Sequence, residues 1–214
     1  MNQKDMTADL RRAVPAFFAA AAFVAAALAG IVFIHHRADV PYGDLTRDPS
    51  IILHGQLTSG ILSTIGGLVW AMGVGIALLA AAASAGNRPE VRFFLWSAAF
   101  TTWLMGDDVF LFHEKLFPVY LGVPEIVFHA AYPLFALAWI VVFRRRILLS
   151  PWPLAFAAFG FLALSELLDV CSDGREQDIR FLLEDGAKFA GIMMWSTYLL
   201  IAGRDAVKPV QNVR

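Results

Sequence analysis

Long apolar runs recur along the chain, and short polar stretches separate them. About 20 apolar residues in a row form an α-helix long enough to cross the hydrocarbon core of a bilayer. Runs of this kind predict six transmembrane helices, at about residues 13–34, 57–83, 91–111, 126–143, 153–170 and 181–202. The fourth and fifth runs are short, but Pro151 and Pro153 fit the start of a helix, because proline is tolerated in the first helical turn. We therefore expect an all-α integral membrane protein in which residues 1–214 form a single domain, a bundle of six transmembrane helices.

The composition also indicates a membrane protein. Of 214 residues, 58% are hydrophobic and 16% are charged, and the mean hydropathy is +0.62. Soluble domains carry about 25% charged residues. The lone cysteine, Cys171, excludes an internal disulfide and a thiolate metal cluster. The sequence has no phosphate-binding glycine loop, dinucleotide motif or nucleophile elbow, and nothing in it indicates binding to nucleic acid.

Basic residues are sorted between the two sides of the predicted bundle. With the N-terminus inside, the cytoplasmic segments hold more of them than the outer loops, as the positive-inside rule requires. Acidic residues are sorted the opposite way, toward the outer ends of the helices. The sequence therefore predicts a multi-pass protein of the bacterial inner (plasma) membrane with both termini in the cytoplasm. The cytoplasmic basic residues would be Lys4, Arg11, Arg12, Arg88, Arg92, Arg144, Arg145, Arg146, Arg204, Lys208 and Arg214.

Ionisable residues interrupt the outer part of four predicted helices. At about 1.5 Å per residue, they all lie roughly 20–27 Å from the cytoplasmic ends of their helices. Each ionisable group at a helix centre costs about 2.5–3.5 kcal/mol when it faces lipid. We therefore expect these side chains to meet in the bundle interior or around a watery cavity. They are Asp107, Asp108, His129, Glu166, Asp169, Glu184, Asp185 and Lys188.

The spacing of these residues predicts which of them share a helix face. Glu166 lies three residues before Asp169, and Glu184 lies four residues before Lys188, so each pair lies on one face. We expect Lys188 to neutralise Glu184, Asp185 or an acid from another helix.

The end of the third predicted helix allows several arrangements. Asp107 and Glu114, seven residues apart, share a face, whereas the same α-helical spacing directs His113 elsewhere, toward the lipid head groups. Two alternatives stay open. Asp107 and Asp108 could cap the outer helix end in solvent, and His113 and Glu114 could be interfacial.

An excess of buried carboxylates needs raised pKa values, a bound metal, or a conducted cation or proton. Carboxylate and imidazole ligands together suit zinc, iron or manganese, so a divalent transition metal is the predicted cofactor. No HExxH, HxxxH or ExxH motif places two ligands on one helical face. The candidate metal ligands are Asp107, Asp108, His113, Glu114, His129 and Glu166. The candidate catalytic residues are Asp108, Glu166, Asp169, Glu184 and Lys188.

Three functions fit this pattern. The first is a metal-assisted hydrolase that acts on a membrane lipid or another amphiphile near the extracytoplasmic face. The second is a cation or proton channel or transporter, and the third is a non-catalytic membrane subunit or sensor. The cytoplasmic halves of the first, fourth and sixth helices are almost wholly apolar, which favours a pocket open to one side over a conducting path.

A stripe of small residues marks the second predicted helix. Small residues at four-residue spacing allow another helix to approach closely. The partner could belong to the same chain or to a second subunit of a homo-oligomer. The stripe consists of Ser59, Ser63, Gly67, Ala71 and Gly75.

Overall fold

The computed structural model describes residues 18, 21–22, 24–26, 28–46, 49, 53–55, 58–170 and 178–207. Within these ranges every regular element is a helix, which confirms the predicted all-α class. The chain divides into two compact units, Met1–Ser59 and Gly60–Arg214. We describe each unit by itself.

The described part of the first unit contains an apolar helix, Val24–Ala38, and the short helix α2, Tyr42–Thr46. The ring of His35 stacks on that of Tyr42 with the centroids 3.9 Å apart, and its Nδ1 lies 2.9 Å from the carbonyl oxygen of Val40. These contacts connect the end of the longer helix to α2. The start of the first predicted span lies outside the described residues.

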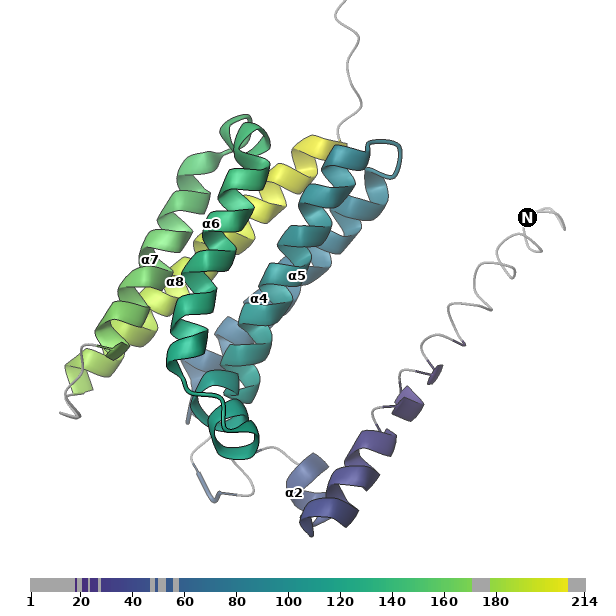
Figure 1. Ribbon diagram of the computed structural model, residues 1–214, viewed down its shortest axis with the longest axis vertical. Coiled ribbons are helices and arrows are strands. Elements are labelled where there is room, and N and C mark those ends of the chain that lie inside the picture. The colour runs from purple at the N-terminus through teal and green to yellow at the C-terminus, as the bar shows by residue number, and fades with distance from the viewer. Residues whose placement is uncertain are drawn as a thin grey trace, which may run out of the picture. The chain divides into compact units, whose positions relative to one another are not determined.

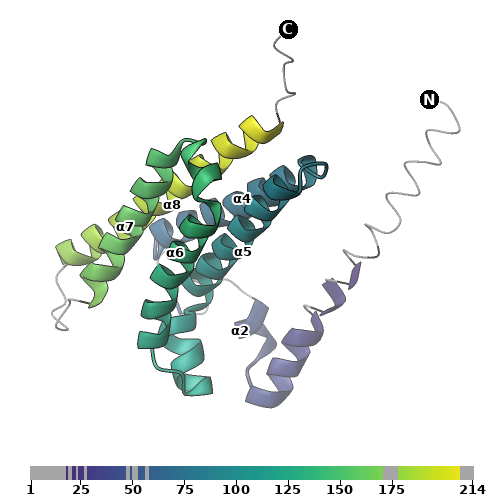
Figure 2. The same cartoon turned by 45° about the horizontal axis from the view of Figure 1, so that its top comes forward.

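The second unit is a helical bundle (Figure 1). In it, α8 packs along α7 and α4, and α4 packs along α5, in both views of Figures 1 and 2. Helix α6 approaches α5 and α7 closely at few positions. Its helices are α4 (Ile61–Ala83), α5 (Arg88–Phe110), the π-helix η1 (Phe112–Leu121), α6 (Ile126–Leu148), α7 (Trp152–Val170) and α8 (Asp178–Val207).

The five later predicted runs correspond to α4, α5, α6, α7 and α8. Three described helices, α4, α6 and α7, are long and apolar enough to cross a membrane. Helix α6 continues five residues past the predicted end and includes the Arg144–Arg146 run. Arg146 is half-buried there, and its Nε lies 2.7 Å from Glu90 Oε1 on α5. This arginine therefore joins two helices as well as contributing to the basic run.

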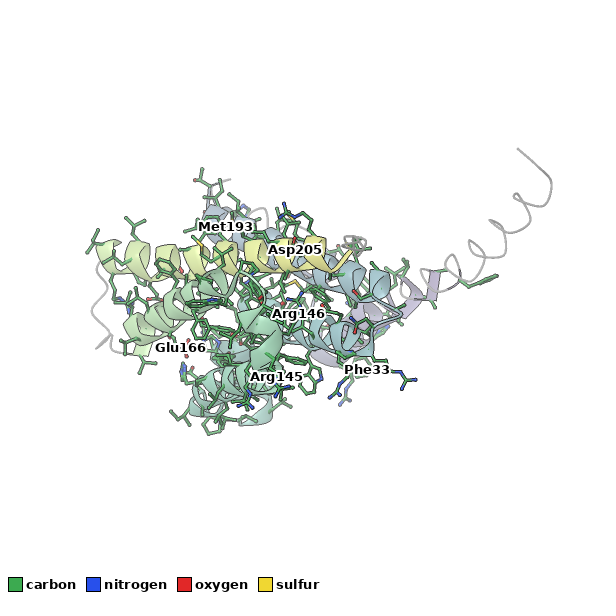
Figure 3. The ribbon with its side chains drawn as sticks, turned by 90° about the horizontal axis from the view of Figure 1, so that it is seen from above. Phe33, Arg145, Arg146, Glu166, Met193 and Asp205 are labelled. Atoms are coloured by element: carbon green, nitrogen blue, oxygen red, sulfur yellow. The ribbon has the colours of Figure 1, made fainter. Side chains whose placement is uncertain are left out.

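One end of the bundle holds the α4–α5 turn, the α6–α7 turn and the end of α8 (Figure 1). We call it the arginine end, after Arg146, which Figure 3 labels together with Arg145 on α6. The opposite end, where α5 ends and α6 begins, is the acid end. Helix α5 starts at the arginine end, where Asn87 precedes it and Pro89 occupies its first turn, a position that tolerates proline.

Between the arginine end and mid-bundle, the core is largely aromatic, and two of its indole N–H groups are paired with hydroxyl groups. Trp139 donates from Nε1 to Ser97 Oγ at 3.0 Å, and Trp195 donates from Nε1 to Thr101 Oγ1 at 2.9 Å. All four side chains are buried. Because a buried N–H without an acceptor is costly, these hydroxyl groups fix the two indole rings.

The predicted small-residue stripe is not the buried face of α4. Ser59, Ser63 and Ala71 are exposed, and a Cβ added at Gly75 would meet nothing within 4 Å. The face that packs on α8 is offset from the stripe, since a Cβ at Gly73 would lie 3.1 Å from Ser196 Oγ. Within the described part of the second unit, the stripe therefore faces no partner over most of its length, and a partner helix stays a prediction.

The connection from α5 to α6 departs from α-helical geometry at Leu111, whose φ of 52° and ψ of 50° are left-handed. The chain then continues as η1 and ends it at Gly122, with φ 66°. The turn brings the Phe112 ring against Gly106, where an added Cβ would lie 2.9 Å from Phe112 Cε2. Only glycine fits this approach without a shift of the ring. The turn also moves His113 back toward the end of α5.

Candidate functional site

A cavity of about 660 Å³ lies within the second unit and is bordered by α4, α5, η1, α6, α7 and α8. We call it the acid cavity. All nine residues that the sequence nominated as metal ligands or catalytic groups line it. They are Asp107, Asp108, His113, Glu114, His129, Glu166, Asp169, Glu184 and Lys188. Of the eight residues selected by depth along separate helices, seven line this cavity, whereas Asp185 is exposed and borders the smaller cavity beside it. The roles of all these residues stay predictions.

Asp107 and His113 form a histidine–carboxylate pair. Asp107 is 7% exposed, and its Oδ1 and Oδ2 lie 2.9 Å and 2.8 Å from His113 Nδ1. Oδ1 also accepts the backbone N–H of His113 at 2.9 Å. The hydrogen bond to Asp107 raises the pKa of His113 above its usual value. This carboxylate holds the proton on Nδ1, which leaves Nε2 for chemistry in the cavity.

The expectation that His113 points toward the head groups was therefore wrong. It assumed that α-helical spacing continues through residue 114. The left-handed conformation of Leu111 ends α5, and the π-helical path of η1 returns the imidazole to Asp107. Glu114 stays near the same ring, with Oε1 3.7 Å from His113 Nε2. The alternative in which Asp107 is a solvated helix cap is also wrong, because its carboxylate is buried against His113.

His129 and Glu166 form a second histidine–carboxylate pair. His129 lies in the first turns of α6, and Glu166, labelled in Figure 3, reaches its Nδ1 from α7. The two imidazole rings are near each other, with centroids 5.7 Å apart. The Tyr132 hydroxyl lies 3.4 Å from His113 Nδ1. The pairs come from four different elements, and each uses the Nδ1 atom of its imidazole, while His113 Nε2 lies near Glu114.

Lys188 forms an ion pair with an acid from another helix. Its Nζ lies 3.4 Å from Asp108 Oδ1, so α8 is tied to α5. This is one of the alternatives that the sequence left open. Glu184, one turn earlier on α8, faces Arg180 at 3.6 Å instead. Lys188 and Asp108 also border a small cavity of about 20 Å³ together with Ser63, so the ion pair lies between two spaces.

The predicted metal ligands share a cavity but are not gathered into a ligand set. Within the described ranges, no three His, Cys, Asp or Glu side chains are close enough together to hold a metal ion. A catalytic zinc uses three protein ligands. Here the Nδ1 atoms of both histidines face carboxylates, an arrangement that orients an imidazole equally for proton transfer or for ligation through Nε2.

Away from the acid end the cavity wall is apolar. From Asp169 to Phe159 it follows α7 for about 15 Å. Trp70 contributes to the wall from α4 and is 2% exposed. Its indole Nε1 is buried and has no hydrogen-bond partner among the described residues. The apolar lining consists of Phe100, Leu104, Pro133, Ala136, Leu137, Ile140, Phe159, Leu162 and Ala163.

The chain matches the model of a protein family whose description names no activity. The family described as "Domain of unknown function (DUF8692)" matches residues 16–202. The chain belongs to this family. No curated protein and no solved structure matches the chain.

Two residues that line the acid cavity, Tyr132 and Trp70, were not predicted from the sequence of this DUF8692 member. Tyr132 lies three residues after His129, so the helical spacing that linked the acids could have found it. Trp70 gave no comparable sign, because a tryptophan within an apolar run is ordinary in a membrane protein. Its significance depends on tertiary packing, which leaves its N–H buried without an acceptor among the residues that the structure describes.

Proposed function

We propose that this protein is a multi-pass membrane enzyme that hydrolyses a lipid or another amphiphile inside the acid cavity. One observation carries the proposal: two histidine–carboxylate pairs lie side by side on the wall of a cavity whose wall toward mid-bundle is apolar. The pairs supply groups for proton transfer, and the apolar wall suits a hydrocarbon chain.

The proposed topology has six spans, with the acid end toward the extracytoplasmic face and both termini in the cytoplasm. The basic residues at the arginine end support this orientation through the positive-inside rule. They include Arg88 and Arg92 at the start of α5 and the Arg144–Arg146 run at the end of α6. An amphiphile would then enter the cavity from the outer leaflet.

The reaction needs one base and one acid. His129 would take a proton from water through Nε2, while Glu166 stabilises the imidazolium that forms. The water oxygen bonds to the carbonyl carbon of an ester or amide, and the bond to the leaving group breaks. His113 would give its proton to the departing oxygen or nitrogen, because its contact with Asp107 favours the protonated form. Lys188 would balance the charge of Asp108.

The acid–base form of the reaction is favoured over the metal-assisted form. A metal-bound water would need three protein ligands, and the described side chains do not bring three together. A cation or proton pathway is also less favoured. It would have to cross the half of the bundle next to the arginine end, where the buried core is mainly aromatic and aliphatic.

The test uses purified protein in an uncharged detergent with p-nitrophenyl esters of increasing chain length, and with a membrane lipid extract analysed by mass spectrometry. We expect hydrolysis by the wild type and a fall of about 10²-fold or more in His129→Gln and in His113→Gln. Glu125→Gln is the matched control, because Glu125 is an exposed acid at the same end that does not line the cavity. Hydrolysis that survives both histidine changes, or no hydrolysis of any ester or lipid, would overturn the proposal.

A further inference from the structure

We infer that the acid cavity accepts an amphiphile with a positively charged head group, an amine or a quaternary ammonium, and a hydrogen-bond acceptor near the start of its chain. The inference rests on the proposed function in assigning the substrate to this cavity. It depends on three features of the lining: its charge, the division of its wall into two chemical parts, and one buried indole.

The charge of the lining is strongly negative. Six carboxylates line the cavity, against one lysine and two histidines. Arg180, outside the lining, faces one of the six through Glu184. Carboxylates therefore outnumber the basic groups even when both histidines carry a proton. An ionised group in a poorly solvated space is stabilised by an opposite charge nearby, so a cationic head group is favoured here and an anionic one is repelled.

The wall separates two parts of a ligand. The ionisable side chains gather at the acid end, whereas the lining toward mid-bundle consists of aliphatic and aromatic side chains such as Phe100, Ile140 and Phe159. A small cation would leave this apolar surface uncovered. An amphiphile places its head group against the carboxylates and its chain against the apolar wall.

Trp70 points independently to a ligand. It is 2% exposed and lines the cavity, yet its Nε1 has no acceptor within the described part of the chain. Trp139 and Trp195, equally buried, each donate to a hydroxyl group. A buried N–H normally has a partner, so the missing acceptor is expected on the ligand. Trp70 lies two turns from Ser63 on α4, about 10 Å along the helix, which places the acceptor below the head group.

A binding experiment with four single-chain probes tests the head group. Dodecyltrimethylammonium, lauroylcholine, dodecyl maltoside and dodecyl phosphate are added below their micelle concentrations to the intact protein in an uncharged detergent, and tryptophan fluorescence gives the dissociation constants. We expect the two cations to bind at least about tenfold more tightly than the neutral and anionic probes. Asp169→Asn should weaken the binding of both cations, while Glu125→Gln, outside the cavity, should not. Equal binding of dodecyl maltoside, or tighter binding of dodecyl phosphate, would overturn the inference.

Trp70→Phe tests the acceptor. The change removes the N–H and keeps an aromatic ring of similar shape. Lauroylcholine has an ester carbonyl next to its chain and dodecyltrimethylammonium has none, so only the binding of lauroylcholine should weaken. An equal loss for both cations, or no loss for either, contradicts the assigned role of Trp70.

Choline release from lauroylcholine separates this inference from the proposed function. Binding of the cations without choline release supports the ligand class and counts against the hydrolase. Hydrolysis of neutral esters without any preference for cationic probes supports the hydrolase and overturns the ligand class.

Discussion

The two halves of the bundle differ in how their interior is filled. One half is packed with aromatic and aliphatic side chains, and the other encloses a cavity lined by carboxylates. In the aromatic core, the indole N–H groups of Trp139 and Trp195 have hydroxyl acceptors, and at the arginine end Arg146 is paired with Glu90. Toward the acid end, six carboxylates line a cavity, and Trp70 borders it from the same aromatic core with an N–H that has no acceptor among the described residues. Buried polar atoms normally have a partner, and some without one occur in both halves, for example at Ser84 and at Trp70, but the acid half also has a large cavity that a ligand could fill.

The same helices therefore contribute to a packed core in one half, which we expect to determine stability, and to a cavity in the other half, which we expect to determine function. Helices α5 and α6 contribute to both halves, through Ser97 and Trp139 in the aromatic core and through Asp107 and His129 in the cavity. The aromatic core can hold the ends of these helices in place while the cavity side chains keep room for a ligand. Functional sites often depart from the general rules that protein interiors are fully packed and that buried charges are paired.

The largest expected effect is the loss of a core tryptophan. Trp139→Ala should lower the free energy of unfolding by about 3–5 kcal/mol, because it creates a cavity and removes the indole that donates to Ser97. Trp70→Ala should cost less, since Trp70 already faces a cavity and gives up no hydrogen bond to a described residue. Unfolding in detergent, followed by circular dichroism, measures both. If Trp70→Ala were the more destabilising change, the contrast between the two halves would be wrong.

A smaller effect is expected where α7 and α8 approach most closely. A Cβ added at Gly191 would lie 2.7 Å from Leu162 Cγ and 3.1 Å from the Ala158 carbonyl oxygen. Gly191→Ala should therefore lower stability by about 1–3 kcal/mol through overpacking. Gly186, on the same helix, has nothing within 4 Å of an added Cβ, so Gly186→Ala should be neutral or stabilising by up to about 1 kcal/mol. Thermal unfolding of both variants measures the difference, and equal effects would show that α7 and α8 are not this close.

The hydrophobic pattern was sufficient to locate the helices of the second unit. Each apolar run is near the length that a bilayer requires, although the fourth and fifth runs are short, and α4 to α8 follow those runs. The end of α6 was placed too early because a run of three arginines resembles a loop. A helix that leaves the apolar layer can continue, and here the partner Glu90 supports Arg146 on an extra turn.

The sequence predicted how far along its helix each candidate residue lies, but it did not predict the orientation of every side chain. Counting residues gives the height of a side chain along a regular helix, and this selected Asp107, His129 and Glu166. The count failed at His113 because neither glycine nor proline marks the left-handed Leu111. The offset between the small-residue stripe and the buried face of α4 was also beyond the sequence, since it depends on how α8 crosses α4.

The smallest expected effect is a pH dependence from the pair at the end of α5. Because Asp107 raises the pKa of His113, the protonated imidazole contributes stability that is fully present below the usual histidine pKa of about 6.5. This contribution is lost as the pH rises through the higher pKa of the folded protein. The gap in thermal stability between wild type and His113→Gln should therefore be widest in mild acid and shrink in alkali. Thermal unfolding measured across that range tests this, with Glu125→Gln as the control that should show a constant gap. A His113→Gln gap that grows with pH would mean that the imidazole is neutral beside Asp107, and would remove the reason for assigning it as the acid.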